Sequence, residues 1–261
     1  QNTVDTCGTG GDMKDTLNIS TSAAIVAASA GIKIAKHGNR SVSSKCGSAD
    51  MLEEIGFKIT SDINELEDSL IKKNFCFLFA QNHHSAMKNV INVRKNLGTR
   101  TIFNLLGPLT NPANAKIQLL GVYAKELVSI HCNCLKELGS ERALVVHGLD
   151  GLDEISLSDK TLINELKDNK INEFVFDPKD YGYDYIKIEE IKGGNPDFNS
   201  YAFLDMINGN NEPYQNIVAI NAGAAIYLSG KAKNLKEGFK IAHKVLDEGI
   251  TKDFVYSVTN G

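Results

Sequence analysis

The sequence VDTCGTGGD, residues 4–12, joins an apolar start to a loop rich in glycine, and NIST, residues 18–21, follows before a segment rich in Ala and Ile. A strand, a glycine-rich turn and a helix start in this order form a natural anion site. Glycine lets the backbone approach a ligand closely, and the first amides of a helix are unpaired. The spacing matches neither the mononucleotide P-loop nor the GxGxxG pattern. A glycine-rich turn alone is only a tight turn in about half of all cases, but the donors Asn18, Ser20 and Thr21 favour a ligand site.

The pattern on either side of this stretch predicts alternating strands and helices. Strands are expected at residues 4–7, 33–36, 76–80, 117–123 and 143–147, and helices at residues 22–30, 48–55, 85–96 and 127–138, with a further helix start near residue 61. Beyond residue 148, short strands at 154–157, 171–176 and 185–188 precede helices at 200–207, 217–228 and 235–246. The alternation predicts an α/β fold with a largely parallel central sheet flanked by helices, an antiparallel extension and C-terminal helices.

Composition and charge exclude several classes of protein. With 261 residues and 42% hydrophobic content, the chain can bury a large core. Its net charge of -4 lacks the basic excess of a free-standing nucleic-acid binder. The five cysteines fit neither a zinc site nor a disulfide framework, which indicates a reducing, cytoplasmic compartment. No apolar run approaches the roughly 20 residues that cross a bilayer, so the expected partners include neither nucleic acid nor membrane.

A second polar loop, KHGNR at residues 36–40, directly follows an expected strand, and serines and the helix start GSAD at residues 47–50 come next. A cation, polar side chains and glycines in one loop suit phosphate and ribose oxygens. The alternative is a solvated basic loop with a helix cap at Ser48. That alternative is favoured for His37 alone, whereas the whole cluster at a strand end favours a ligand.

Two carboxylates, Asp153 and Glu154, end the sequence HGLDGLDE after the expected strand at residues 143–147. Carboxylate oxygens are ligands that Mg²⁺ prefers, and Mg²⁺ keeps several waters and bridges to substrate phosphates, so two protein carboxylates are enough. An isolated Asp-Glu pair is more often an ordinary acidic turn. This pair follows a buried strand end, where ligand sites of α/β folds gather, and the position favours a metal site.

A fourth group of residues begins with two adjacent histidines and continues through Arg94 to TIFNLLGPLTNP at residues 101–112. His84 and Arg94 are ten positions apart in the chain, which on a helix places them roughly 15 Å apart along nearly one face. They could line one groove but not bind one atom together. The alternative makes His84 a capping residue and Arg94 a surface residue. No order typical of a Ser-His-Asp triad and no nucleophilic cysteine setting is evident.

Taken in order, these motifs resemble the anthranilate phosphoribosyltransferase family. The resemblance rests on DTCGTGGD with NIST, on KHGNR with GSADMLEEIG, and on HHSAMKNVINVRKNLGTRTIFNLLGPLTNP, and it continues through VVHGLDGLDEIS, GGNPDFNS and INAGAAIYLSG. It spans essentially the whole chain, and the combination is specific although each short motif is not.

The resemblance implies transfer of the phosphoribosyl group from 5-phosphoribosyl 1-pyrophosphate (PRPP) to the amine of anthranilate, with release of pyrophosphate. It implies that the PRPP site is formed by Gly8, Thr9, Gly11, Asp12, Asn18, Ser20, Thr21, Lys36, Asn39 and Ser48. It implies that anthranilate is bound by Gly8, His37, Asn39, His84 and Arg94. Mg²⁺ would be held by Asp153 and Glu154, with Ser20 at a second ion. No residue is implied as a general base.

The family also implies features beyond the site. Its members carry a helical segment before the glycine motif that contributes to dimerisation, so residues 1–261 are expected to be the catalytic α/β domain with that small domain upstream. A homodimer is expected, and an upstream glutamine amidotransferase fusion or an anthranilate synthase partner is possible within the family. Ser85 stands where the family often has Pro, and Cys46 where it often has Ser or Gly.

Three other readings remain open. A pyrimidine nucleoside phosphorylase shares the general architecture, although the Asn-Arg pair after residue 38 and the pair Asp153-Glu154 favour the transferase. A nucleic-acid-binding relative on the same scaffold is opposed by the acidic net charge. The third reading is an inactive structural fragment.

Overall fold

The computed structural model describes residues 3–41, 45–84 and 101–259, and these residues form a sheet of seven strands in the order β3-β2-β1-β4-β5-β6-β7. The strands are β1 (Val4–Gly8), β2 (Ile34–Gly38), β3 (Phe75–Phe79), β4 (Ile117–Gly121), β5 (Arg142–Gly148), β6 (Thr161–Lys167) and β7 (Lys170–Phe176). Strands β1 to β5 pair in parallel, and β6 and β7 add an antiparallel hairpin at one edge. The expected sheet, parallel with an antiparallel extension, is confirmed.

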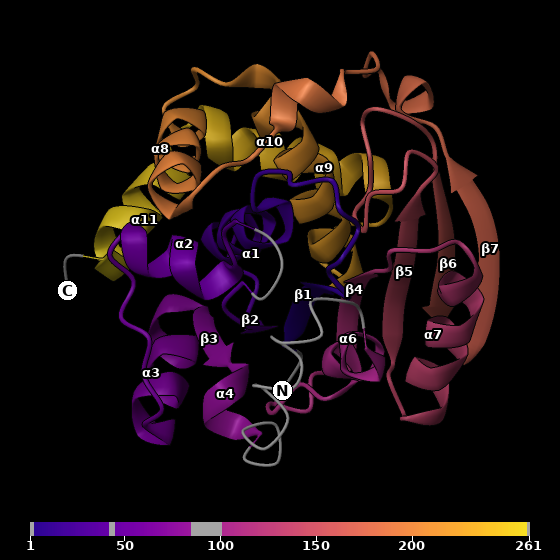
Figure 1. The fold of residues 1–261 in the computed structure, drawn as a ribbon, viewed down its shortest axis with the longest axis horizontal. Coiled ribbons are helices and arrows are strands. Elements are labelled where there is room, and N and C mark those ends of the chain that lie inside the picture. Colours follow the sequence, from indigo (N-terminus) through magenta and orange to yellow (C-terminus); the bar gives the residue numbers. More distant parts are fainter. Residues whose placement is uncertain (1–2, 42–44, 85–100, 260–261) are drawn as a thin grey trace.

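Helices cover both faces of this sheet (Figure 1). The longer helices are α1 (Ile19–Ser29), α2 (Ser48–Glu54), α3 (Ile63–Lys73), α7 (Glu126–Glu137), α8 (Pro196–Ile207), α9 (Glu212–Leu228), α10 (Leu235–Asp247) and α11 (Ile250–Thr259). Short helical turns are α4 (Ala80–His83), α6 (Ile102–Leu106), η2 (Gly107–Leu109), η3 (Pro178–Tyr181) and η4 (Ile188–Ile191). Within the described ranges no helix is long and apolar enough to cross a membrane.

The parallel strands β1 to β5 are buried on both faces, which explains their largely apolar runs. Every residue of β3, including Cys76, is buried. On one face, strand residues such as Val4 and Leu119 pack in a core with α1, α9 and α10. On the other face, Leu120 and Val145 pack against α7. A parallel sheet needs helices on both faces to exclude water from these runs.

Several predicted boundaries were wrong. Residues 154–157 and 185–187 are irregular rather than strands, and Ile188 begins η4. β6 and α11 were not predicted, and α1 begins at Ile19, earlier than expected. The cause at residues 154–157 is a side chain. Asn221 Oδ1 accepts the Ile155 N–H at 3.0 Å and Asn221 Nδ2 donates to the Ile155 carbonyl at 2.9 Å, so this backbone is satisfied without a neighbouring strand. The helix expected at residues 85–96 lies outside the described residues.

The strand order creates a switch point beside β1. From β1 the chain builds β2 and β3 on one side, and it then crosses to place β4 on the other side of β1. In open α/β sheets the crevice at the carboxyl ends of such strands is where ligands bind. Two glycines, Gly8 and Gly121, are paired at this point.

Candidate functional site

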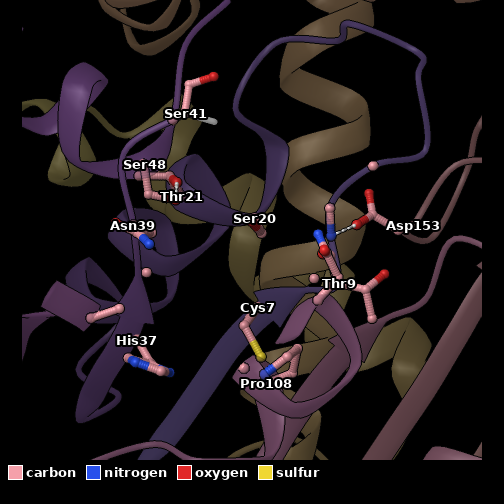
Figure 2. Close-up of a pocket in the computed structure, with 18 of the residues that line it drawn as sticks. Cys7, Thr9, Ser20, Thr21, His37, Asn39, Ser41, Ser48, Pro108 and Asp153 are labelled. Carbon is pink, nitrogen blue, oxygen red and sulfur yellow. Dashed lines mark hydrogen bonds between the residues drawn. The ribbon is translucent and has the colours of Figure 1, made fainter. Parts of the chain in front are cut away.

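A cleft of about 940 Å³ opens at the carboxyl ends of β1, β2 and β3. Every predicted site residue in the described part of the chain lines it. Its walls include Gly8, Thr9, Gly11, Asp12, Asn18, Ser20, Thr21, Lys36, His37, Asn39, Ser48, His84, Asp153 and Glu154. Figure 2 shows Asn39, Ser48 and Thr21 on one side of the cleft, facing Thr9 and Asp153 on the other. Arg94 lies outside the described residues.

Glycine at the two paired strand ends lets the acidic loop enter the cleft. A Cβ at Gly121 would collide with the backbone carbonyl of Asp153, and a Cβ at Gly8 would lie 2.5 Å from Asp153 Oδ2. Asp153 therefore passes over the ends of both strands, with its backbone at Gly121 and its side chain at Gly8, and its Oδ2 accepts a hydrogen bond from the Gly10 N–H at 2.8 Å. The pair of glycines is what places a carboxylate beside the glycine-rich loop.

Three carboxyl groups, Asp12, Asp153 and Glu154, share this end of the cleft. Burial, followed by the charge of Asp12, raises the pKa of Asp153 to about 7. Burial, followed by the charge of Asp153, raises the pKa of Glu154 well above its usual value. Glu154 Oε1 accepts the Ser20 N–H at 3.1 Å, at the amino-terminal end of α1. The described residues contain no group of three or more side chains arranged to hold a metal alone, so a cation held here would take its further oxygen ligands from water or from a bound substrate.

Lys36 is a buried cation that lines the cleft. Its side chain is 1% exposed, and Nζ donates to the Thr6 carbonyl at 2.5 Å and to Ser20 Oγ at 3.4 Å. Burial lowers its pKa, and the charges of Asp5 and Glu154 oppose that shift. The other cation of the same loop, Arg40, also lines the cleft, but its guanidinium group forms ion pairs with Asp50 and Glu53 of α2. Of these two cations, Arg40 is neutralised by carboxylate partners, whereas Lys36 is hydrogen-bonded to a backbone carbonyl and a hydroxyl.

Two histidines lie at the opposite end of the cleft from the carboxylates. His37 Nε2 and His84 Nε2 are 3.2 Å apart and their rings meet edge to face, with His84 at the end of α4. Burial, followed by the nearby charge of His84, lowers the pKa of His37 to about 4. Near neutral pH His37 is therefore an uncharged imidazole, able to donate or accept one hydrogen bond according to its tautomer.

The depressed pKa of His37 predicts a loss of stability in acid. Because the folded chain favours neutral His37, the unfolded chain binds more protons between pH 6.5 and 4, and the free energy of unfolding falls as pH is lowered through that window. The full contribution is at most about 3 kcal/mol. The test is urea unfolding of the wild-type chain and of His37→Gln at several pH values from 7 to 4. The difference between their free energies of unfolding should shrink as pH falls, and taking this difference cancels the contribution of the carboxyl groups that both proteins share. A difference that stays constant with pH would contradict the assignment.

Polar side chains join the loops that form the cleft. Thr21 Oγ1 donates to Ser48 Oγ at 3.0 Å, which ties the start of α1 to the start of α2. Gln81 Nε2 donates to Asn39 Oδ1 at 3.2 Å. Residues predicted from separate motifs are therefore in direct contact.

Three residues at this site were missed in the sequence. Asp5 is fully buried beneath the cleft, where its Oδ1 accepts the His37 N–H at 3.1 Å. Asn104 Nδ2 donates to the Thr9 carbonyl at 3.3 Å. Asn199 contacts Asn18. A charged residue inside an otherwise buried strand is a signal that points to Asp5. Asn104 and Asn199 lie inside quoted motifs, but no local pattern singles them out.

Comparison with known proteins agrees with this geometry. Residues 1–252 match the family described as "Glycosyl transferase family, a/b domain". An anthranilate phosphoribosyltransferase of Thermoanaerobacter sp. (strain X514) is 50% identical over 250 residues, which cover 96% of this chain and 74% of that one.

Two solved structures superpose closely. The crystal structure of anthranilate phosphoribosyltransferase from Thermus thermophilus has a TM-score of 0.92 at 39% identity, covering 100% of this chain and 78% of that one. The enzyme from Saccharomyces cerevisiae in complex with PRPP and Mg has a TM-score of 0.87 at 30% identity, covering 99% and 73%. The likeness therefore extends over the whole described cleft.

Proposed function

This chain belongs to the anthranilate phosphoribosyltransferase family, whose members transfer the phosphoribosyl group of PRPP to the amine of anthranilate in tryptophan biosynthesis, and we propose that the cleft at β1, β2 and β3 is where this occurs. The observation that carries the proposal is the arrangement of charge. Buried Lys36 and the amino-terminal end of α1 face the same cavity as Asp153 and Glu154. That combination suits a polyanion that arrives with a hard cation.

The PRPP side of the cleft is the glycine-rich end. We propose that PRPP contacts Gly8, Thr9, Gly11, Asp12, Asn18, Ser20, Thr21, Lys36, Asn39 and Ser48. Backbone amides of the loop and of α1, together with the Lys36 ammonium, would bind phosphate oxygens. Because these donors are held by strands and by contacts between loops, they need little rearrangement when charge builds on the leaving pyrophosphate.

Mg²⁺ fits the carboxylate end of the cleft. The donor set is three carboxyl groups with raised pKa values, which is the behaviour of oxygen ligands buried together without a cation. We propose that Asp153 and Glu154 hold Mg²⁺, with Ser20 beside them at a second ion. When bound, Mg²⁺ supplies Lewis-acid stabilisation of the pyrophosphate group. The complex of the Saccharomyces cerevisiae relative with PRPP and Mg supports this use of the ion.

The anthranilate side is the histidine end. We propose that Gly8, His37, Asn39, His84 and Arg94 line it. Anthranilate brings its own nucleophilic amine, so a bond forms between that nitrogen and the anomeric carbon as the carbon–oxygen bond to pyrophosphate breaks. The residues of the cleft would contribute orientation and charge stabilisation rather than a covalent intermediate. No general base is assigned.

The proposal also covers the domain, the oligomeric state, the compartment and the partners of the chain. Residues 1–261 are taken as the catalytic α/β domain, and a homodimer in the cytoplasm is proposed on the family resemblance. A glutamine amidotransferase or anthranilate synthase partner has the same support.

A fluorescence assay tests the proposed function. Anthranilate fluorescence is followed over time with PRPP and Mg²⁺, and it is expected to fall only when both are present. Residues 1–261 are compared with a longer chain that carries the upstream segment typical of the relatives. If neither chain consumes anthranilate, the substrate assignment is wrong, and phosphorolysis of thymidine without Mg²⁺ would favour the pyrimidine nucleoside phosphorylase instead.

A further inference from the structure

The segment GGNPDFNS, residues 193–200, packs directly against the loop that leads from the glycine motif into α1. The Gly193 N–H donates to the Asp15 carbonyl at 2.7 Å, and the Leu17 N–H donates to the Ile191 carbonyl at 2.9 Å. A Cβ at Gly193 would lie 2.5 Å from the Thr16 carbonyl oxygen. This close contact brings α8, far along the chain, to the edge of the cleft.

Asn199 of α8 completes a chain of hydrogen bonds with fixed polarity. The Gly194 N–H donates to Asn199 Oδ1 at 2.7 Å, and Asn199 Nδ2 donates to Asn18 Oδ1 at 2.8 Å. Asn18 Nδ2 then donates to the Cys46 carbonyl at 3.3 Å. A backbone amide at one end can only donate and a backbone carbonyl at the other can only accept. The orientation of both side-chain amides therefore follows without ambiguity.

This arrangement diverts Asn18 from the usual role of its position. Asn18 is the N-cap residue of α1, where an Asn side-chain oxygen normally accepts an amide of the first helical turn. Here the side chain makes no such cap bond, because its oxygen accepts from Asn199 instead. Asn199 is 1% exposed, so water does not compete for this contact.

We propose that Asn199 is a positioning residue that makes Asn18 present an N–H, rather than its oxygen, to the anionic donor substrate. An amide nitrogen carries two hydrogens, and Cys46 takes one of them, so Asn18 keeps a second donor beside the cleft that it lines. Because Asn18 Oδ1 faces Asn199, it does not compete with phosphate oxygens for the backbone N–H donors at the start of α1. The inference rests on the proposed binding of PRPP in this cleft.

Asn199→Asp is the sharpest test because the two side chains have nearly the same shape. The carboxylate still accepts from the Gly194 N–H but cannot donate to Asn18 Oδ1, so the Asn18 amide is expected to turn its oxygen toward the cleft. The KM for PRPP should rise about tenfold or more, the scale of one hydrogen bond to a charged group, while the KM for anthranilate changes little. Asn199→Ala should raise the KM for PRPP less, because Asn18 is released rather than reversed.

A double-mutant cycle separates positioning from a structural role. In an Asn18→Ala background, replacing Asn199 should not raise the KM for PRPP further, because the residue through which Asn199 acts is gone. Asn195→Ala is the matched control. Asn195 caps the same helix by accepting the Phe198 N–H, so its loss should lower the melting temperature and leave the KM for PRPP unchanged.

The possible results distinguish a failure of this inference from a failure of the proposed function. An equal rise in the KM for PRPP with and without Asn18 would make Asn199 a structural residue only and overturn the inference. If Asn18→Ala leaves the KM for PRPP unchanged in an active enzyme, the assignment of Asn18 to PRPP is wrong and the inference fails with it. If Asn199→Ala does not fold, Asn199→Asp, which keeps the bond to Gly194, decides.

Discussion

Glu154→Gln and Asp153→Asn are each expected to lower turnover by at least about a hundred-fold, the scale of losing one group that stabilises developing charge. The amide side chains preserve the hydrogen bonds from the Ser20 and Gly10 amides, so only the negative charge is lost. Without that charge the cleft holds Mg²⁺ poorly. Turnover measured against Mg²⁺ concentration should show a weaker apparent affinity for the ion as well as a lower maximum.

Stability is expected to move in the opposite direction. The raised pKa values mean that the fold disfavours ionised Asp153 and Glu154, so the cost grows as pH rises above the unfolded pKa, is complete above the folded pKa, and is absent from the neutral amides. Urea unfolding at pH 8 without Mg²⁺ should therefore give an equal or larger free energy of unfolding in both variants. Asp180→Asn, an exposed position of η3 away from the cleft, is the control. Unchanged turnover at saturating Mg²⁺ would remove the metal assignment.

Lys36→Met is expected to lower kcat/KM for PRPP by roughly 30-fold to a thousand-fold or more, the effect of removing one partner from a desolvated charge contact. Methionine fills a similar volume but brings no positive charge to the phosphate oxygens. Steady-state kinetics should place most of the loss in the terms for PRPP, with the KM for anthranilate nearly unchanged. Lys33→Met, just before β2 and outside the residues that line the cleft, should behave like the wild type.

The same substitution leaves Asp5 buried without the cation that offsets its charge. Lys36→Met is therefore also expected to lower the free energy of unfolding. The double variant Asp5→Asn and Lys36→Met restores neutrality beneath the cleft. It is expected to recover the free energy of unfolding lost in Lys36→Met and to recover none of the activity. Recovery of activity in the double variant would show that Lys36 serves the fold alone.

Local patterns were sufficient for much of the fold. The strand at residues 4–7 and the apolar run at 76–80 were predicted nearly at their observed bounds, because strands covered on both faces have continuous apolar sequences. The helix that follows Asp62 was likewise expected from its start, where Asp62 Oδ1 accepts the Asn64 N–H. The strand β6 was missed because its apolar residues do not alternate with polar ones. The strand expected at 154–157 was wrong because the Asn221 side chain, rather than a neighbouring strand, satisfies the Ile155 backbone.

The motifs of the site could also be recognised from the sequence alone. Residues after strand ends meet at one edge of a parallel sheet, where ligand sites gather, and the family resemblance implied that the glycines, Lys36 and the pair Asp153-Glu154 serve one site. Their placement around a single cavity agrees with that expectation. The chemistry of each residue type, with its position relative to a strand, carries this information locally.

Only the tertiary structure decided the protonation of those residues and the orientation of their hydrogen bonds. The neutral imidazole of His37 depends on burial and on His84, and the orientation of Asn18 depends on Asn199, which lies 181 positions away in the chain. Such properties arise from desolvation and from partners that only the folded chain brings within hydrogen-bond distance. The sequence by itself therefore determined which groups gather at the cleft, and the fold determined which of them carry charge and which way their donors point.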